Sequence, residues 1–203
     1  MSVTQEPRVD ATMQVAPKQA AETASEHGSV MTTTASKIAA VLRIAMGLVF
    51  LWAFLDKLFG LGYATASESA WLNGGSPTEG YLSGVDVGPF AATMNSLAGA
   101  AWADWLFMAG LLGIGAALLL GVGLRVSAAA GTVMLMLMWL AAWPLARFTE
   151  AGELTRSTNP IIEDHLIYAL VLILLAAVYA GNTWGLGRRW AGVGFVRHNH
   201  WLR

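Results

Sequence analysis

Residues 104–131 read DWLFMAGLLGIGAALLLGVGLRVSAAAG, two apolar runs that flank the short segment GVGLRVS at 121–127. With the residues beyond them, the runs extend over 105–123 and 126–145, each close to the roughly 20 residues that a helix needs to cross the hydrocarbon core of a bilayer. The glycines between them permit a tight turn. This stretch therefore predicts an antiparallel pair of membrane-spanning helices.

Two further apolar runs, 36–60 and 161–180, predict two more spans. The whole composition agrees, since 56% of the 203 residues are hydrophobic and 12% are charged, against about 25% charged in a typical soluble domain. The mean hydropathy is +0.54. We therefore expect an all-α fold, an integral membrane four-helix bundle, with a long extracytoplasmic loop between the first and second helices at 61–104. Loops of this length are usually functional or partly structured.

The chain divides into three parts. Residues 1–34 are rich in Thr, Ala, Ser and Gln, and predict a disordered cytoplasmic tail; Met31 is a candidate alternative start, since every predicted span lies beyond it. Residues 35–190 form the predicted transmembrane domain, and 191–203 a basic cytoplasmic tail. The net charge of −1 and the absence of Cys argue against nucleic acid as a partner and exclude disulfides and thiolate chemistry.

The distribution of Lys and Arg predicts the orientation. Four spans place both termini on one side, and nine of the twelve Lys and Arg residues fall on that side, against Lys57, Arg147 and Arg156 on the other. Positive charge is enriched in cytoplasmic segments. We expect a multi-pass protein of the plasma membrane with both termini in the cytoplasm and the lipid bilayer around its helices.

Ionisable residues gather at the predicted outer ends of the helices. The stretch FLWAFLDKLFGLGY at 50–63 places an acid and a base side by side, and the other three helices contribute similar groups. The full layer contains Asp56, Lys57, Asp104, Arg147, Glu163, Asp164 and His165. Charge within a membrane is costly unless it is paired or faces a cavity, so these residues are functional candidates.

Simpler roles remain open for several of them. Asn159 can cap the last helix with Pro160 at its first position, and Glu163 and Asp164 then complement the helix dipole. His165 is harder to explain in this way, because it can exchange a proton near neutral pH.

On the first helix, Arg43 and Lys57 are expected to extend toward the two membrane interfaces. For Asp56, structural ion pairing and a functional pocket are both open. Trp52, Trp139 and Trp143 fall within or near the outer half of the spans, where they either line a flat aromatic pocket or pack in the core. Three methionines, Met134, Met136 and Met138, predict helix packing and lipid contact, because no His or Cys accompanies them as a copper ligand.

Several stretches resemble the DoxX/DoxD family of four-helix membrane proteins, over about residues 39–190. They are LRIAMGLVFLWAFLDKLFGLGY, WLNGGSPTEGYL, the opening hairpin, NPIIEDHLIYALVLILLAA and GNTWGLGRRW. The chain looks most similar to the DoxD branch, the large membrane subunit of thiosulfate:quinone oxidoreductase. The resemblance implies oxidation of thiosulfate to tetrathionate, with electrons passed to a membrane quinone, and a second small subunit or redox partner protein.

The same resemblance suggests roles for the candidate residues. Protons for the quinone would come from His165 with Asp164 or Asp56. The thiosulfate dianion would meet the cations Lys57 and Arg147, with Asp104 and Glu163 in the same layer. The quinone would lie among Trp52, Trp139, Trp143 and Tyr168. No bound cofactor and no metal are expected.

Two other classes of function remain open. The first is a noncatalytic membrane scaffold of a redox or stress-protection complex, in which the charged layer is a docking surface and a structural network. The second is a transporter or channel for a small anion. The lack of an evident internal repeat and of helices broken near the bilayer midplane argues against transport.

Overall fold

The computed structural model describes residues 31–155 and 157–202, and within these ranges every regular element is helical. Residues 1–30 of the predicted tail at 1–34 lie outside the described residues. The first described helix, α2, spans Thr33–Phe59. The side chain of Thr32 caps it by accepting the N–H of Ala35 at 3.2 Å, and Gly60 ends it in the left-handed conformation with φ 65°.

In the part of the chain that the structure describes, three helices are long and apolar enough to cross a membrane: α2, α5 at Ala101–Leu120 and α6 at Leu124–Ala142. The fourth predicted span corresponds to α7, Asp164–Ala177, which has 14 residues. Its apolar length is about 21 Å at the usual rise per residue, less than the hydrocarbon core. The fold thus indicates a helical membrane protein with three candidate spans and one shorter apolar helix.

The start of α7 differs from the sequence expectation. Its N-cap is Glu163, whose carboxylate accepts the N–H of His165 at 3.1 Å. The side chain of Asn159 instead accepts the N–H groups of Ile161 and Ile162 at 3.1 and 3.0 Å. This is a local Asx turn. The prediction that Asn159 caps the helix was wrong because the turn leaves residues 161–162 in the loop before it.

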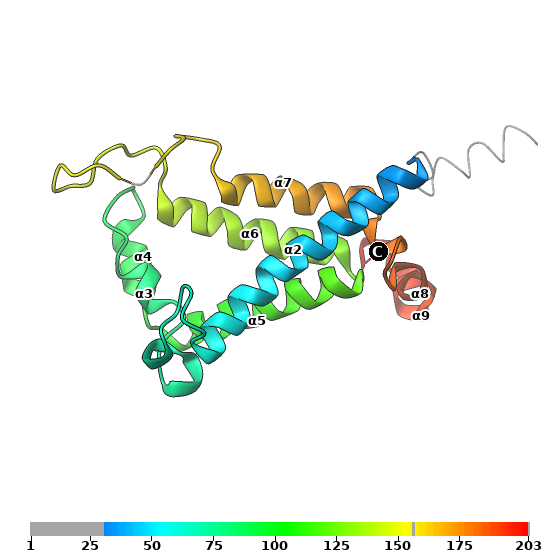
Figure 1. The fold of residues 1–203 in the computed structure, drawn as a ribbon, viewed down its shortest axis with the longest axis horizontal. Coiled ribbons are helices and arrows are strands. Elements are labelled where there is room, and N and C mark those ends of the chain that lie inside the picture. The colour runs from blue at the N-terminus through cyan, green and yellow to red at the C-terminus, as the bar shows by residue number, and fades with distance from the viewer. Residues whose placement is uncertain (1–30, 156, 203) are drawn as a thin grey trace, which may run out of the picture.

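The long helices form two packed pairs, α2 with α5 and α6 with α7. Figure 1 shows that the pairs diverge from the α5–α6 turn, and that α3 and α4 lie across the open end. Both glycines of the turn have positive φ, 71° at Gly121 and 57° at Gly123, so the predicted tight turn is confirmed. A Cβ on Gly115 would lie 2.9 Å from the backbone N of Leu51, so glycine is needed for the close approach of α2 and α5.

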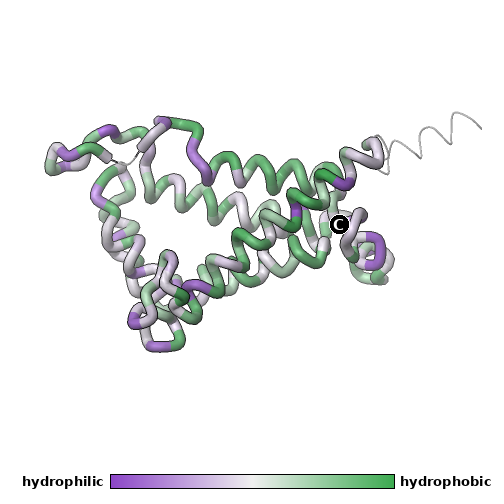
Figure 2. Tube along the Cα trace, viewed as in Figure 1, coloured by the Kyte–Doolittle hydropathy of each residue, from purple (hydrophilic) through white to green (hydrophobic). Residues whose placement is uncertain are grey.

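We call the end with the Gly121–Gly123 turn the turn end, and the opposite end the loop end. At the loop end, residues 60–100 include η1 at Ser67–Ser69, η2 at Trp71–Asn73, α3 at Glu79–Leu82 and α4 at Ala91–Leu97. The chain leaves α7 at the turn end through η3 at Ala180–Asn182, α8 at Gly187–Gly192, α9 at Gly194–His198 and η4 at His200–Leu202. Hydrophobic residues dominate the helices between the two ends (Figure 2).

Arg43 closes the turn end from within. The side chain is fully buried, and its guanidinium donates to the carbonyls of Leu118, Leu119 and Trp184, the last two at 2.8 and 2.9 Å. The first two carbonyls belong to the last turn of α5, where carbonyls run short of helical N–H partners; that of Leu118 also accepts the N–H of Gly121 at 3.2 Å. The expectation that Arg43 extends to a membrane interface was wrong, because these carbonyls bind its charge inside the protein.

Candidate functional site

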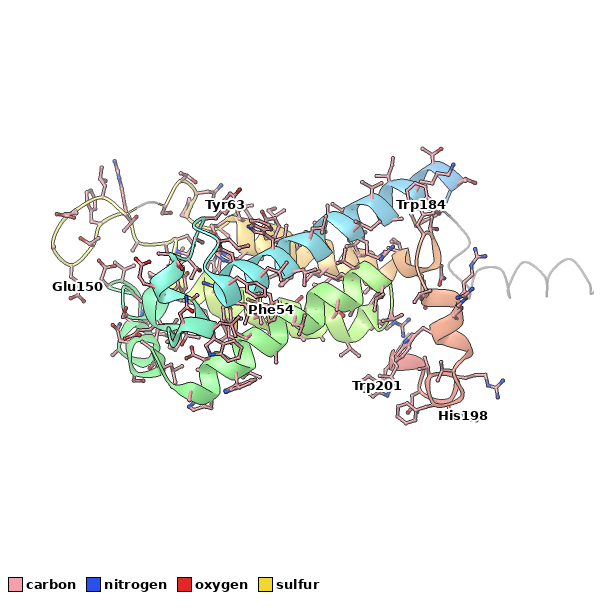
Figure 3. The ribbon with its side chains drawn as sticks, turned by 60° about the horizontal axis from the view of Figure 1, so that its bottom comes forward. Phe54, Tyr63, Glu150, Trp184, His198 and Trp201 are labelled. Atoms are coloured by element: carbon pink, nitrogen blue, oxygen red, sulfur yellow. The ribbon has the colours of Figure 1, made fainter. Side chains whose placement is uncertain are left out.

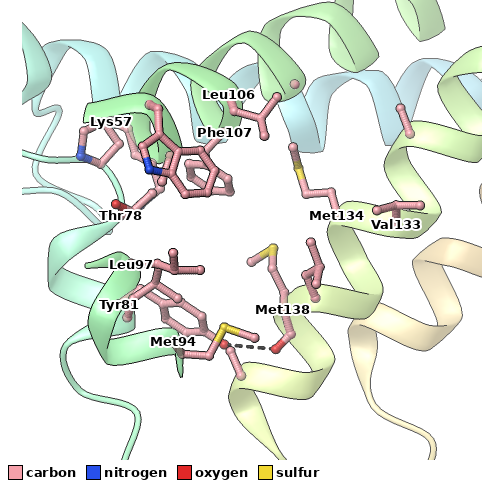
Figure 4. Close-up of a pocket in the computed structure, with 18 of the residues that line it drawn as sticks. Lys57, Thr78, Tyr81, Met94, Leu97, Leu106, Phe107, Val133, Met134 and Met138 are labelled. Carbon is pink, nitrogen blue, oxygen red and sulfur yellow. Dashed lines mark hydrogen bonds between the residues drawn. The ribbon is translucent and has the colours of Figure 1, made fainter. Parts of the chain in front are cut away.

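The candidate site is a cavity of about 660 Å³ between α5, α6 and the α3–α4 segment. One wall carries Leu106 and Phe107 of α5, and the facing wall carries Met134 and Met138 of α6 (Figure 4). The third side comes from residues 77–97 of the connection between α2 and α5. The lining is almost wholly apolar, as expected for a site that holds a lipophilic small molecule.

Lys57 is the charged residue among those that line this cavity. Its ammonium lies 5.8 Å from the centroid of the Phe107 ring, a cation–π arrangement. The side chain is half-buried at the C-terminal end of α2. The site therefore combines an apolar volume with one positive group at its edge.

Tyr81 connects the α3 wall to α6. Its hydroxyl donates to the backbone carbonyl of Met138 at 3.3 Å, the dashed line in Figure 4. Partial removal of the hydroxyl from water and the nearby negative charge of Glu163 both raise the pKa of Tyr81. The phenol therefore keeps its proton at the edge of the cavity and remains a hydrogen-bond donor there.

Asp104 supports the wall formed by residues 76–78. One oxygen of its buried carboxylate accepts from the hydroxyls of Ser76 and Thr78 at 2.9 and 2.7 Å, and from the N–H of Thr78 at 2.9 Å. Pro77 and Thr78 line the cavity. The structure thus places Asp104 where it holds this loop against the start of α5.

Asp56 and Lys57 are adjacent in sequence but contact different partners. The buried Asp56 carboxylate accepts the N–H groups of Tyr63 and Ala64 at 3.4 and 3.0 Å, which folds the chain back over the end of α2. No ion pair joins Asp56 to Lys57. Of the two, Lys57 reaches the cavity, whereas the Asp56 carboxylate is held by backbone donors.

The side chains of Glu163 and His165 are in contact at the start of α7. Nδ1 of His165 lies 2.7 Å from both carboxylate oxygens, and the two side chains are 19% and 27% exposed for His and Glu. Glu163 also acts electrostatically on Tyr81. Both side chains of the pair are partly exposed at the loop end and neither lines the cavity, whereas the neighbouring Asp164 is exposed.

The predicted aromatic pocket is distributed over separate places. Trp139 and Trp143 meet edge to face with centroids 6.0 Å apart, and the Trp139 indole donates to the carbonyl of Ile161 at 3.2 Å. Trp52 lies on α2 with its ring 5.1 Å from that of Tyr63. None of these three tryptophans is among the cavity-lining residues.

Two other candidates also lie away from the cavity. Tyr168 packs against the main apolar core. Arg147 is exposed in the loop after α6, with its guanidinium 5.5 Å from the Phe148 ring centroid. Figure 3 shows the length of the molecule with its side chains, and labels Glu150 in that loop.

Sequence reasoning missed most of the cavity-lining residues, including Tyr81, Met94, Trp102 and Phe107. One signal was available in Met134 and Met138, which are four residues apart and so share a helix face. That face was interpreted as lipid contact and packing. The approach of residues 77–97 to the same face is a tertiary contact for which the sequence offers no local signal.

No protein-family model, curated protein or solved structure matches the chain. The resemblance to the DoxX/DoxD family therefore stays a prediction. The described residues contain no group of three or more His, Cys, Asp or Glu side chains placed to hold a metal ion. The class of protein that the fold and site indicate is a helical membrane protein with a largely apolar cavity at its loop end.

Proposed function

We propose that the chain is the membrane subunit of a quinone-linked oxidoreductase of the DoxX/DoxD type, and that it binds a membrane quinone in the cavity between α5 and α6. In this proposal α7 completes a four-helix membrane bundle. The observation that carries the proposal is an apolar cavity of about 660 Å³ with a single ammonium group, Lys57, at its edge.

A quinone matches this chemistry. Its ring is flat and apolar, and its two carbonyl oxygens accept hydrogen bonds and become negative as the ring is reduced. An ammonium carries three donors, and a cation fixed near developing negative charge stabilises it. Phe107 and the flexible methionines of α6 would contact the ring faces. The volume falls within the roughly 300–1,000 Å³ of small-molecule sites.

The cavity is also accessible from the side of the helices. Leu106, Val133 and Leu137 line it, yet they are 66%, 61% and 52% exposed. Apolar residues at the level of a membrane-spanning helix face lipid, so a lipophilic ligand would enter between α5 and α6 from the bilayer. A quinone with an isoprenoid tail would leave that tail among the lipids.

The resemblance supports thiosulfate as the electron donor. Two thiosulfate ions joined as tetrathionate release two electrons, and the quinone takes up these electrons with two protons to become quinol. In this proposal the protons reach the quinone by way of the Glu163–His165 pair and Tyr81. In this orientation the loop end faces outward from the plasma membrane, both termini are cytoplasmic, and a second small subunit completes the enzyme.

The direct test is quinone binding followed by turnover. Purified protein in detergent is titrated with a soluble ubiquinone or menaquinone analogue, and thiosulfate is then added. We expect binding that weakens about tenfold, or about 1.4 kcal/mol, in Lys57→Gln and is unchanged in Trp52→Phe, which lies outside the cavity. Equal binding by Lys57→Gln and wild type, or no binding by a folded wild type, would contradict the proposal.

A noncatalytic scaffold is the second candidate, favoured by one observation. The buried groups Arg43, Asp56 and Asp104 are all engaged by hydrogen bonds within the chain, as in a structural network. A scaffold predicts that His165→Ala leaves quinone-analogue binding intact and lowers recovery of a copurifying protein. Loss of thiosulfate-dependent quinone reduction in that variant, with recovery unchanged, would favour the enzyme.

A further inference from the structure

Residues 79–99, here called the strap, leave and rejoin the rest of the fold at one place. Just before the strap, Thr78 donates its N–H and its hydroxyl to the Asp104 carboxylate at 2.9 and 2.7 Å. Just after it, the carbonyl of Ala100 accepts the N–H of Asp104 at 3.0 Å. Asp104 therefore holds both ends of the strap at the start of α5.

Between these ends, the strap crosses the open end of the molecule to α6 (Figure 1). It meets α6 in a small apolar cluster whose buried members are Val85, Met94 and Ala141, separate from the main core of the helices. The hydroxyl of Tyr81 also donates to the carbonyl of Met138 at 3.3 Å (Figure 4). The strap residues that line the cavity are Tyr81, Leu82, Met94 and Leu97. The strap therefore covers the cavity at the loop end.

The attachments at Asp104 and at α6 differ in strength. At Asp104 a carboxylate accepts from a hydroxyl and an N–H of Thr78, and hydrogen bonds to a charged group are roughly twice as strong as neutral ones. At α6 the hydrogen-bonding groups are neutral, and the apolar cluster is small. Segments with few buried apolar contacts open locally at a lower free energy than global unfolding requires. The strap should therefore separate from α6 while its ends stay on Asp104.

The strap also has the features of a segment that moves as one body. Its two helices are tied together by the Asn95 side chain, which donates to the carbonyls of Val85 and Ala91, both at 2.7 Å. Glycines lie close to both anchored ends. A Cβ on Gly80 would have no atom within 4 Å, and Gly99 has a φ of 73°. Because glycine tolerates a wide range of backbone angles, both ends can absorb the rotation of a hinge.

We propose that the strap is a lid, hinged at Asp104, that opens the cavity to water at the loop end. The structure shows the closed position. Opening breaks the contacts with α6 and gives water-soluble reactants access to Lys57 at the edge of the cavity. This route is separate from the one between α5 and α6, so a polar and a lipophilic reactant reach one cavity from different phases. The inference does not depend on which ligand the cavity binds.

The reaction of Lys57 with a reagent in water measures the opening. Full-length protein in detergent is treated with sulfosuccinimidyl acetate, a charged reagent that acetylates amines. The acetylation rates of Lys57 and Lys37 are then measured by mass spectrometry of peptides. Lys37 is exposed near the start of α2 and does not line the cavity. The ratio of the Lys57 rate to the Lys37 rate is therefore independent of the reagent concentration.

A disulfide can lock the strap, because the chain contains no Cys that would compete. Met94→Cys with Ala141→Cys replaces two residues of the same apolar cluster, and oxidation of this pair joins the strap to α6. We expect the rate ratio to fall at least about fivefold in the oxidised pair, because the lock removes the open state, and to recover on reduction. Each single Cys variant, oxidised in the same way, should react as wild type. Circular dichroism checks that every variant is folded.

Tyr81→Phe weakens the closed position instead, by removing the hydrogen bond to Met138. The loss of one such bond shifts an equilibrium by about fivefold, and the rate ratio should rise by about that factor. Tyr63→Phe, which removes an exposed phenol hydroxyl outside the strap, should leave the ratio unchanged.

An unchanged rate ratio in the oxidised Cys pair would overturn the inference. An unchanged ratio in Tyr81→Phe, or an equal rise in Tyr63→Phe, would overturn it too, since the contact with α6 would then not control access to Lys57. Should oxidation fail to join the Cys pair, the comparison of Tyr81→Phe with Tyr63→Phe still decides the outcome.

Discussion

The two ends of α2 use buried charge in different ways. At the turn end, Arg43 donates to carbonyls from α5 and from the loop after α7, and the helices close around it. At the loop end, Asp56 is likewise satisfied by backbone groups, but the neighbouring Lys57 faces the cavity. A buried charge with backbone partners is a structural element. A charge at the edge of an apolar cavity is the better candidate for ligand binding.

The substitution with the largest expected effect on stability removes the buried charge at the turn end. Arg43→Ala removes the side-chain donor of the Leu119 and Trp184 carbonyls and leaves that of Leu118 with the Gly121 N–H alone, and should lower the free energy of unfolding by on the order of 3 kcal/mol. Arg43→Lys should recover only part of this loss. A compact ammonium lacks the planar fork of a guanidinium, so it cannot donate at once to the α5 carbonyls and to the carbonyl of Trp184. Thermal unfolding in detergent measures both. An Arg43→Ala variant as stable as wild type would show that the turn end does not depend on this contact.

The corresponding substitution at the loop end should cost less stability. Asp104→Ala removes the acceptor for Ser76 and Thr78, and should cost about 2 kcal/mol. Unlike the Arg43 change, it should act locally, by releasing the 76–78 wall from α5. Limited proteolysis should therefore cut within 60–100 faster, while the turn end stays protected. Uniform cleavage along the chain would contradict a local role.

The cavity itself can be closed without touching any charge. Ala130 of α6 lines the cavity and is exposed, so Ala130→Phe adds bulk there without overpacking the core. We expect quinone-analogue binding to weaken by about tenfold, or ~1.4 kcal/mol, with the unfolding temperature nearly unchanged. Ala142→Phe, on the same helix but outside the cavity lining, is the control. Equal binding in the two variants would place the ligand elsewhere.

The sequence predicted those parts of the fold that depend on local signals. Apolar length identified α2, α5 and α6, and the glycines at 121 and 123 predicted the turn between two of them. It failed where two local signals compete, since Asn159–Pro160 and Glu163 both resemble helix starts. Only the structure shows that Asn159 and Pro160 belong to a separate turn and that Glu163 begins the helix.

The site was less predictable than the fold. The layer of ionisable residues was identified from the sequence. Long-range contacts, however, decide which of these charges bonds to backbone groups and which faces the cavity. Arg43 binds carbonyls 75 and 141 residues away. The cavity walls likewise come from separate segments, and residues 77–97 reach α6 only through tertiary packing. Apolar periodicity gives no information on such contacts, so the aromatic pocket was sought among Trp52, Trp139 and Trp143.

The smallest predicted effect is a pH dependence at the loop end. The pKa of Tyr81 is raised above its ordinary value of 10.0, so the folded protein keeps this proton at pH values where the unfolded chain has lost it. Because the folded state then binds more protons, stability falls as the pH rises. The contribution is fully present below about pH 10 and is lost above it as the pH approaches the folded pKa. Tyr81→Phe lacks this titration, so the stability advantage of wild type at pH 8 should shrink between pH 10 and 11.

Glu163→Gln tests the cause of that shift. Removing the carboxylate charge lowers the cost of ionising Tyr81, so the phenol should titrate at lower pH in ultraviolet difference spectra than it does in wild type. Desolvation remains in this variant and should leave part of the shift. Wild type and Tyr81→Phe can also be compared by their unfolding temperatures from pH 8 to 11. If the difference between them stays constant over this range, the phenol is as accessible to water in the folded protein as in the unfolded chain. The loop end would then be more open around α3 than its hydrogen bond to Met138 indicates, and the contrast with the closed turn end would be greater.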